Sequence, residues 1–190
     1  MSLGALLFLG FVVVAGIYAV VVYNNLVQVK HAVAKAWANI DVLLKQRHDE
    51  LPKLIETCKQ YKQFEAATLE RVVAARSRVH NAREHQDIEA LGEAEGMLRM
   101  GLGRLFAVAE AYPELRANEN FMQLQTRISQ LENGIADRRE FYNESVNINN
   151  VRIEQFPDAI VARLFHFDTK PLLEFATAEK ADVDVKALFS

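Results

Sequence analysis

The sequence predicts an all-α protein: an N-terminal transmembrane helix that continues into a long antiparallel, coiled-coil-like helical bundle, followed by an extended C-terminal tail. Three observations support this prediction. The first 29 of the 190 residues carry no charged side chain. Later apolar residues recur in alternating steps of three and four, which is the spacing of a helix packed against other helices. Before residue 180, no stretch alternates polar and apolar residues as a half-buried strand would.

The apolar run from Leu3 to Tyr23 is the predicted transmembrane helix. Its 21 residues would extend about 31 Å as a helix, which matches the hydrocarbon core of a bilayer. The alternative is a cleaved signal peptide, which begins with a positive segment and ends at a small-residue cleavage site. No Lys or Arg precedes this run, and Asn24 and Asn25 follow it. We therefore expect a retained anchor over residues 1–23.

Lys30 and Lys35 follow the apolar run, whereas only a two-residue N-terminal end precedes it. The positive-inside rule relates such a bias to orientation, because Lys and Arg are enriched in cytoplasmic segments. The sequence thus predicts a single-pass protein with its N-terminus outside and its helical bundle in the cytoplasm.

Composition narrows the classes of function. The net charge is −3, and no Lys/Arg cluster is dense enough to predict nucleic-acid binding. The single cysteine, Cys58, excludes an internal disulfide and lies on an apolar stripe, where it is expected as a buried filler. The five histidines lack the spacing of a zinc-binding helix. We therefore predict no catalytic residue, no metal site and no cofactor.

The segment after the anchor is predicted as one long helix from Asn24 to about His80. Its apolar ladder continues in phase across Pro52, so this proline is expected to kink the helix rather than end it. The same ladder passes through Arg47 and Glu65, which places both charges on the seam. Its apolar positions are Val33, Trp37, Ile40, Leu44, Leu51, Leu54, Cys58, Tyr61, Leu69 and Val72.

A second helix is predicted from Asp87 to Tyr112 and a third from Asn118 to Phe156. Asp and Asn are favoured N-cap residues, and a proline follows each of the two predicted last residues. Residues 158–167 are predicted as a short fourth helix. The sequence thus predicts a helical bundle over residues 24–167 with three long helices and one short helix.

Two glycines lie one turn apart on the second helix, at Gly92 and Gly96. Each costs about 1 kcal/mol relative to alanine in a helix interior, so we expect a packing reason for them, such as a close backbone approach.

Charged residues occupy the predicted seams at Arg47, Glu65, Glu95 and Arg138. Counting helical turns puts Glu95 and Arg138 at about the same height, and we expect them to form a buried pair. Arg47 is expected to meet Glu114 and the carbonyl end of the second helix. Loss of one partner from a buried pair would cost roughly 3–5 kcal/mol. The other interpretation is a binding pocket around these charges.

The predicted second helix is too short to reach the stalk, residues 24–50. A stripe there would have no helix of its own chain beside it, and a bare stripe of this kind typically marks an interface. We therefore expect self-association into a homo-oligomer through this stripe. The stripe consists of Val33, Trp37, Ile40 and Leu44.

The predicted tail is residues 168–190, and folding of this tail over the stripe is the alternative to self-association. Residues 181–186 alternate as a strand would and could lie extended along a neighbour. The other interpretation of these six residues is a frayed acidic end.

Several blocks of the sequence, in the same order, resemble the LemA family over most of residues 20–167. The sequence differs from the family pattern at two positions: it has Phe64 where a histidine is usual and Asn149 where a tyrosine is usual. The blocks that carry the resemblance are Ala36-Trp37-Ala38-Asn39-Ile40-Asp41-Val42-Leu43-Leu44-Lys45-Gln46-Arg47, Leu51-Pro52-Lys53-Leu54-Ile55-Glu56-Thr57, Ala111-Tyr112-Pro113-Glu114-Leu115, Phe141-Tyr142-Asn143 and Phe156-Pro157.

The resemblance implies a single-pass protein of the bacterial inner (cytoplasmic) membrane with an antiparallel helical bundle and no enzymatic activity. We therefore expect a non-enzymatic, membrane-anchored structural or scaffold protein that self-assembles and organises or remodels a patch of bacterial membrane. The alternative is an adaptor or regulator of another membrane protein, such as a membrane protease. The expected partners are the lipid bilayer, further copies of the chain and, under the alternative, that other membrane protein.

Overall fold

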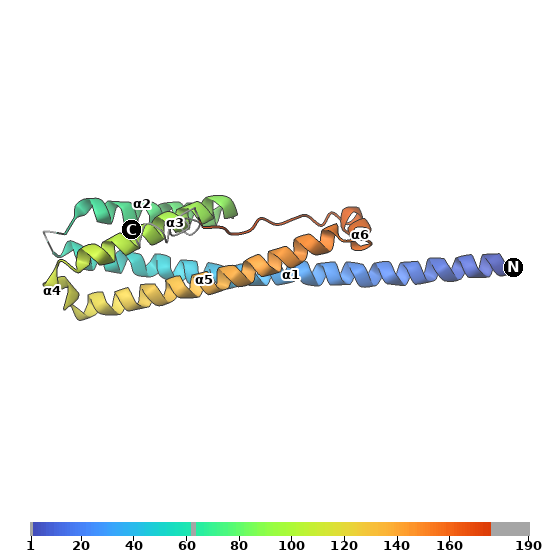
Figure 1. Cartoon of the computed structure of the whole chain (residues 1–190), viewed down its shortest axis with the longest axis horizontal. Coiled ribbons are helices and arrows are strands. Elements are labelled where there is room, and N and C mark those ends of the chain that lie inside the picture. The colour runs from blue at the N-terminus through green and yellow to red at the C-terminus, as the bar shows by residue number, and fades with distance from the viewer. Residues whose placement is uncertain (1, 62–63, 176–190) are drawn as a thin grey trace, which may run out of the picture. The chain divides into compact units, whose positions relative to one another are not determined.

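The computed structural model describes residues 2–61 and 64–175. Within these residues the chain forms six α-helices and no strand, which confirms the all-α prediction (Figure 1). The expected strand-like segment at 181–186 lies outside the described residues. The helices are α1 (Leu3–Lys59), α2 (Ala66–Glu84), α3 (Ile88–Ala109), α4 (Pro113–Arg116), α5 (Glu119–Glu154) and α6 (Asp158–Leu164).

The described chain divides into two compact units. The first unit comprises residues 2–38 and 140–171, which are the longer part of α1, the end of α5, and α6. The second unit comprises residues 39–139 and 172–175, which include the rest of α1, all of α2, α3 and α4, and the beginning of α5.

The prediction of one long helix from Asn24 to about His80 is wrong, because two helices, α1 and α2, occupy this part of the chain. α1 runs through Pro52 as expected but ends before residues 60–65, after which α2 begins. That segment contains neither Gly nor Pro. Tertiary contacts hold its described residues instead: the Phe64 ring lies 5.5 Å from the Tyr112 ring, and Asn118 donates a hydrogen bond of 3.2 Å to the Tyr61 hydroxyl. Long-range packing therefore overrides local helix preference here.

The starts of α3 and α5 lie where the sequence placed them. The Asp87 carboxylate accepts a hydrogen bond of 3.0 Å from the Ala90 amide. The Asn118 side-chain oxygen accepts one of 3.1 Å from the Phe121 amide. Both are N-cap contacts that satisfy amides at the beginning of a helix. At the other end, α3 stops before Tyr112, and α6 is shorter than the predicted 158–167.

The stripe of Val33, Trp37, Ile40 and Leu44 is not bare, so the expectation that a second copy must cover it is wrong. Val33, Ile40 and Leu44 are only 7%, 0% and 1% exposed. The Trp37 ring is half-buried and meets the Tyr142 ring of α5 edge-on at 5.9 Å. The chain covers this stripe by itself, and the ring that packs on Trp37 comes from α5.

The extra reversal at residues 60–65 explains this correction. It adds one change of direction, so that α5 returns along α1 instead of leading away from it. In the first unit, Tyr142 of α5 meets Trp37 of α1, and Ile153 further along α5 packs with Leu26 earlier on α1. The two helices are therefore antiparallel, and the end of α5 approaches the apolar end of α1.

Candidate functional site

Arg47 lies at the centre of the second unit and connects three helices. Its side chain is 2% exposed on α1. One terminal nitrogen, Nη2, donates to the carboxylate of Glu95 on α3, which is also 2% exposed. The other, Nη1, donates to Glu132 Oε1 on α5 at 3.0 Å. Charge-assisted bonds of this kind are about twice as strong as neutral ones, so they fix the register of the three helices.

This arrangement corrects the predicted partners. Glu95 pairs with Arg47, whereas Arg138 is exposed on α5. Glu65 is not buried either: it is the N-cap residue of α2, 43% exposed, and its carboxylate accepts a hydrogen bond of 2.6 Å from the Thr68 hydroxyl. The physical reason is again the extra reversal: α2 is antiparallel to α1 and α3 is antiparallel to α2, so α3 runs parallel to α1 instead of antiparallel, and a different part of α1 comes beside Glu95.

Burial raises the pKa of the Glu95 carboxyl, and the negative charge of Glu132 adds to the rise, while Arg47 opposes it. A cavity of 60 Å³ beside this trio is lined by residues that include Arg99 and Phe175. Ligand pockets are typically roughly 300–1,000 Å³, so this cavity suits one or two water molecules rather than a metabolite. The ion pairs of Arg47 with Glu95 and Glu132 are thus better explained as structural contacts between helices than as a binding pocket.

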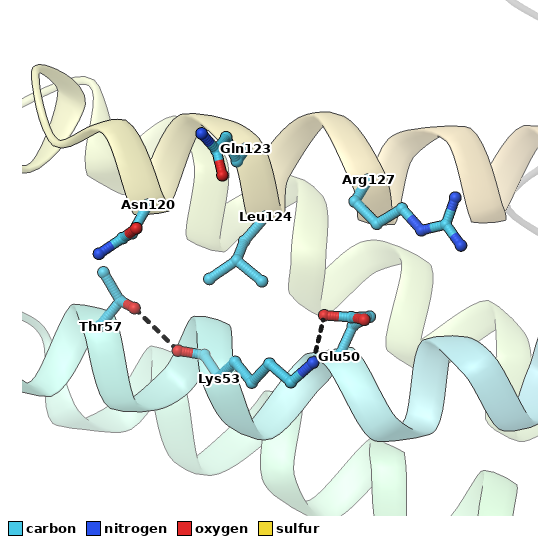
Figure 2. A pocket seen from close by; sticks show the side chains of 7 residues that line it. All are labelled: Glu50, Lys53, Thr57, Asn120, Gln123, Leu124 and Arg127. Carbon is cyan, nitrogen blue, oxygen red and sulfur yellow. Dashed lines mark hydrogen bonds and ion pairs between the residues drawn. The ribbon is translucent and has the colours of Figure 1, made fainter.

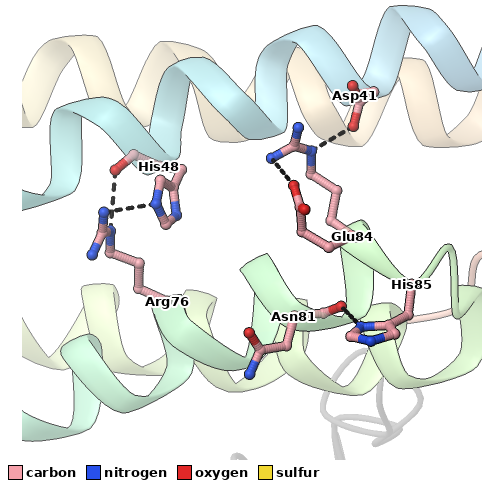
Figure 3. Close-up of polar contacts among 7 residues, drawn as sticks. Asp41, His48, Arg76, Asn81, Glu84 and His85 are labelled. Carbon is pink, nitrogen blue, oxygen red and sulfur yellow. Dashed lines mark hydrogen bonds and ion pairs between the residues drawn. The ribbon is translucent and has the colours of Figure 1, made fainter.

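A second polar cluster joins α1 and α2 (Figure 3). Arg76 donates to the His48 carbonyl at 3.1 Å and to the His48 ring Nε2 at 2.7 Å. The His48 ring also stacks on the His80 ring at 4.7 Å. Because a guanidinium can only donate, Nε2 must accept and the proton of the neutral ring belongs on Nδ1. Burial first, and then Arg76, lower the pKa of His48.

Further along the same pair of helices, Arg83 Nε donates to Asp41 at 2.6 Å (Figure 3). His48 of α1 pairs with Arg76 of α2, and the earlier residue Asp41 pairs with the later residue Arg83. Because the residue numbers change in opposite directions, the two helices are antiparallel. Within residues 2–61 and 64–175, no group of three or more His, Cys, Asp or Glu side chains could hold a metal ion.

An open groove with mostly polar walls runs between α1 and α5 in the second unit (Figure 2). On α1, Lys53 Nζ contacts Glu50 Oε2 at 3.1 Å, and the Thr57 hydroxyl donates to the Lys53 carbonyl at 2.9 Å. The α5 wall consists of Asn120, Gln123, Leu124 and Arg127. Its side chains are those of a solvated surface, and no pair of them forms a nucleophile with a base.

Residues 168–175, here the C-terminal strap, were assigned by sequence only to a tail. In the first unit the strap is held by α5. Asn150 accepts from the Lys170 amide and donates to the Lys170 carbonyl, both at 2.9 Å, and the Tyr142 hydroxyl donates to the Pro171 carbonyl at 3.2 Å. Asn149, on the seam, donates to the Asp168 carbonyl at 3.3 Å.

In the second unit the strap buries Leu173 and Phe175, which are 1% and 8% exposed. The Arg139 guanidinium lies 4.1 Å from the centre of the Phe175 ring, a cation–π contact. A Cβ added to Gly92 would collide with the Glu174 carbonyl oxygen. The close approach expected at this glycine therefore exists, and the signal that could have located the strap was a glycine inside a helix.

By length and composition, α1 is able to cross a membrane, and no other helix within the described ranges 2–61 and 64–175 is. Only 6% of its most apolar window is buried, unlike a core helix of a soluble protein. Val22 and Leu26, at the end of the apolar run, pack with Ile153, Val161 and Ala162. Cleavage of a signal peptide near residue 23 would cut the helix inside this cluster, which favours a retained helix.

Comparison with known proteins identifies the family and several relatives. A sequence model described as LemA family matches residues 36–187. The chain is 26% identical over 167 residues to the protein named "Protein LemA" of Metamycoplasma hominis, which covers 87% of this chain and 74% of that protein. None of the relatives described here or below has a name that denotes an enzymatic activity.

Magnetosome proteins are also similar over a shorter region. MamQ 2 of Paramagnetospirillum magneticum is 34% identical over 89 residues, and MamQ of Magnetospirillum gryphiswaldense is 33% identical over 89 residues. Each match covers 44% of this chain and 33% of the magnetosome protein. The chain therefore spans about a third of the length of these two relatives.

Proposed function

We propose that this chain, which belongs to the LemA family, is a non-enzymatic structural protein that α1 anchors in a bacterial inner membrane, where it organises a patch of the bilayer. One observation carries the proposal: the bare apolar part of α1 continues without a break into its packed part. A continuous helix couples the membrane span directly to the packed part of the first unit, whereas a flexible Gly/Ser linker would let that part move independently of the span. A structural protein of the membrane needs such a direct coupling.

The proposed orientation places the residues before the span outside and the bundle in the cytoplasm, because Lys30 and Lys35 follow the span. Cysteine labelling with a membrane-impermeant maleimide in intact spheroplasts tests this. We expect Ser2→Cys to be labelled and Glu93→Cys, on the exposed side of α3, to react only after permeabilisation. The opposite pattern would reverse the topology, and labelling of both in intact cells would contradict the span itself.

Self-association belongs to the proposal, but the stripe at residues 33–44 is no longer its basis, because one chain buries it. That burial favours a second function, an adaptor for another membrane protein, since a monomer needs no copy to cover its stripe. Light scattering of the full-length protein in mild detergent separates the two. A closed ring or larger array supports the scaffold, and a monomer that retains one other membrane protein at fixed stoichiometry supports the adaptor.

A further inference from the structure

The end of the described bundle carries a compact exposed apolar face on and beside α6. Phe156, just before the helix, is 83% exposed, and Ile160, Leu164 and Phe165 are 60%, 70% and 53% exposed. Ile160 and Leu164 are four apart within α6, which places them on one side of the helix, and Phe156 lies two residues before its start. The other side of α6 is buried through Val161 and Ala162, so the exposed face is the outward side of an otherwise packed helix.

Contacts within the first unit fix the level of this face along α1. Val161 and Ala162 pack against Val22 and Leu26, and the Phe165 ring lies 4.7 Å from the Tyr23 ring. Tyr23 is the last residue of the apolar run. Further towards the N-terminus, residues 2–18 are all exposed, and no other helix that the structure describes lies beside this part of α1 (Figure 1). α6 therefore lies beside the residues at which the span leaves the hydrocarbon core.

We propose that this face of α6 is a second membrane contact, in which Phe156, Ile160, Leu164 and Phe165 enter the interface of the bilayer that α1 spans. The inference rests on the proposed membrane anchoring by α1. It assigns a lipid-binding role to a helix that the sequence offered only as the last short element of the bundle.

Lipid fits this face better than a protein partner for two reasons. The face adjoins the apolar run of α1 through the Tyr23–Phe165 contact, so a bilayer around that run comes next to Phe165. Aromatic rings are also enriched at the level of the lipid headgroups. Lys30 extends over the Phe167 ring, with its Nζ 6.0 Å from the ring centre. A lysine at this level can reach phosphate groups while its stem stays on apolar surface.

Membrane contacts by both α1 and α6 would fix the orientation of the first unit at the bilayer, which α1 alone would not. A single span leaves the helix free to rotate about its axis and to change its tilt, because tilt is set by packing and by interfacial anchors. α6 adds an off-axis anchor, which would fix the rotation and height of the first unit relative to the bilayer. A protein that organises membrane requires such a defined pose.

The test uses the full-length protein in vesicles and reporter cysteines labelled with an environment-sensitive fluorophore. Cys58 is fully buried, and burial raises the pKa of its thiol to about 12, so it reacts poorly with maleimides, and the unmodified chain measures its background. Reporters are placed by Val12→Cys in the span, Ile160→Cys in the face, and Phe141→Cys as the matched control. Phe141 is also apolar, 55% exposed and in the first unit, but lies about 20 Å from the end of α5.

Lipids whose acyl chains carry a doxyl quencher are then added to the vesicle composition. We expect the reporters at 12 and 160 to lose most of their emission, while the reporter at 141 keeps it. Leu164→Cys serves as a second reporter if Ile160→Cys fails to fold, as judged by its circular dichroism.

Each other outcome overturns a specific statement. If the lipid quencher leaves the emission of the reporter at residue 12 unchanged, the anchoring by α1 itself is contradicted. Quenching at 12 with none at 160 and 164 would leave the anchor intact and overturn the second contact. A blue-shifted emission at 160 that resists the lipid quencher would assign the face to a protein partner instead, and so would also overturn it.

Discussion

α1 contains two stretches that differ in composition and in burial: residues 3–21 carry no charged side chain, whereas charged residues recur from Lys30 onwards. In residues 3–21, side chains on every side are exposed, such as Leu7 at 67% and Phe11 at 71%. In residues 22–58, exposure alternates around the helix, with Ile40 at 0% and Val42 at 55%. The first stretch is apolar all round and requires an apolar solvent, whereas the second has polar and charged residues beside an apolar stripe and requires neighbours on one side only.

The largest effect is expected where the buried stretch carries a charge. Arg47→Met should reduce the free energy of unfolding by about 3–5 kcal/mol, because it leaves the Glu95 carboxylate buried without its cation. Denaturant unfolding of the full chain in mild detergent, followed by circular dichroism, measures this loss.

The matched double variant, Arg47→Met with Glu95→Leu, should recover most of the stability. It removes both buried charges, and Glu132, whose side chain is 21% exposed, can keep contact with water. A double variant as unstable as the single one would show that the ion pair is not what supports this part of the bundle.

An intermediate effect is expected from truncating an apolar residue at the boundary of the two stretches. Leu26→Ala should cost about 2–5 kcal/mol, because the side chain is 1% exposed and its removal leaves a cavity. Phe11→Ala, in the bare stretch, should change the stability of the bundle by less than about 0.5 kcal/mol. Equal losses in the same unfolding measurement would erase the distinction between the stretches.

The smallest effect is a pH dependence within the packed stretch. Since the pKa of His48 is lowered from 6.5 by folding, the unfolded chain binds this proton more tightly. The neutral ring therefore contributes stability above pH 6.5, which is lost as the pH falls through the folded-state pKa. The charged or titratable groups around it are Arg76, His80, Asp49 and Arg83.

The measurement is the free energy of unfolding at several values between about pH 8 and 5, because the loss begins near the unfolded-state pKa and continues below it. His48→Gln should flatten its decline on acidification, whereas His31→Gln, at an exposed position of α1, should leave the slope unchanged. A slope that survives in His48→Gln would assign the dependence to another group.

The repeat of apolar residues placed Arg47 and Leu51 on a seam, and single capping residues located the starts of α3 and α5. The same repeat could not locate the break between α1 and α2, because residues 60–65 include neither Gly nor Pro and are compatible with a helix. Without that reversal, the predicted register paired Glu95 with Arg138 instead of Arg47 and placed no helix beside Trp37. Periodicity states that a side is buried, but the turns between helices decide what buries it.

The sequence by itself determined the all-α class, the position of the apolar span and the seam of α1, because hydrophobic burial depends only on which side chains are apolar and how they recur. Only the tertiary structure decided that α5 covers Trp37, that Arg47 pairs with Glu95, and that α6 lies beside Tyr23. These contacts depend on helix direction and register, which are set by packing between residues far apart in the chain.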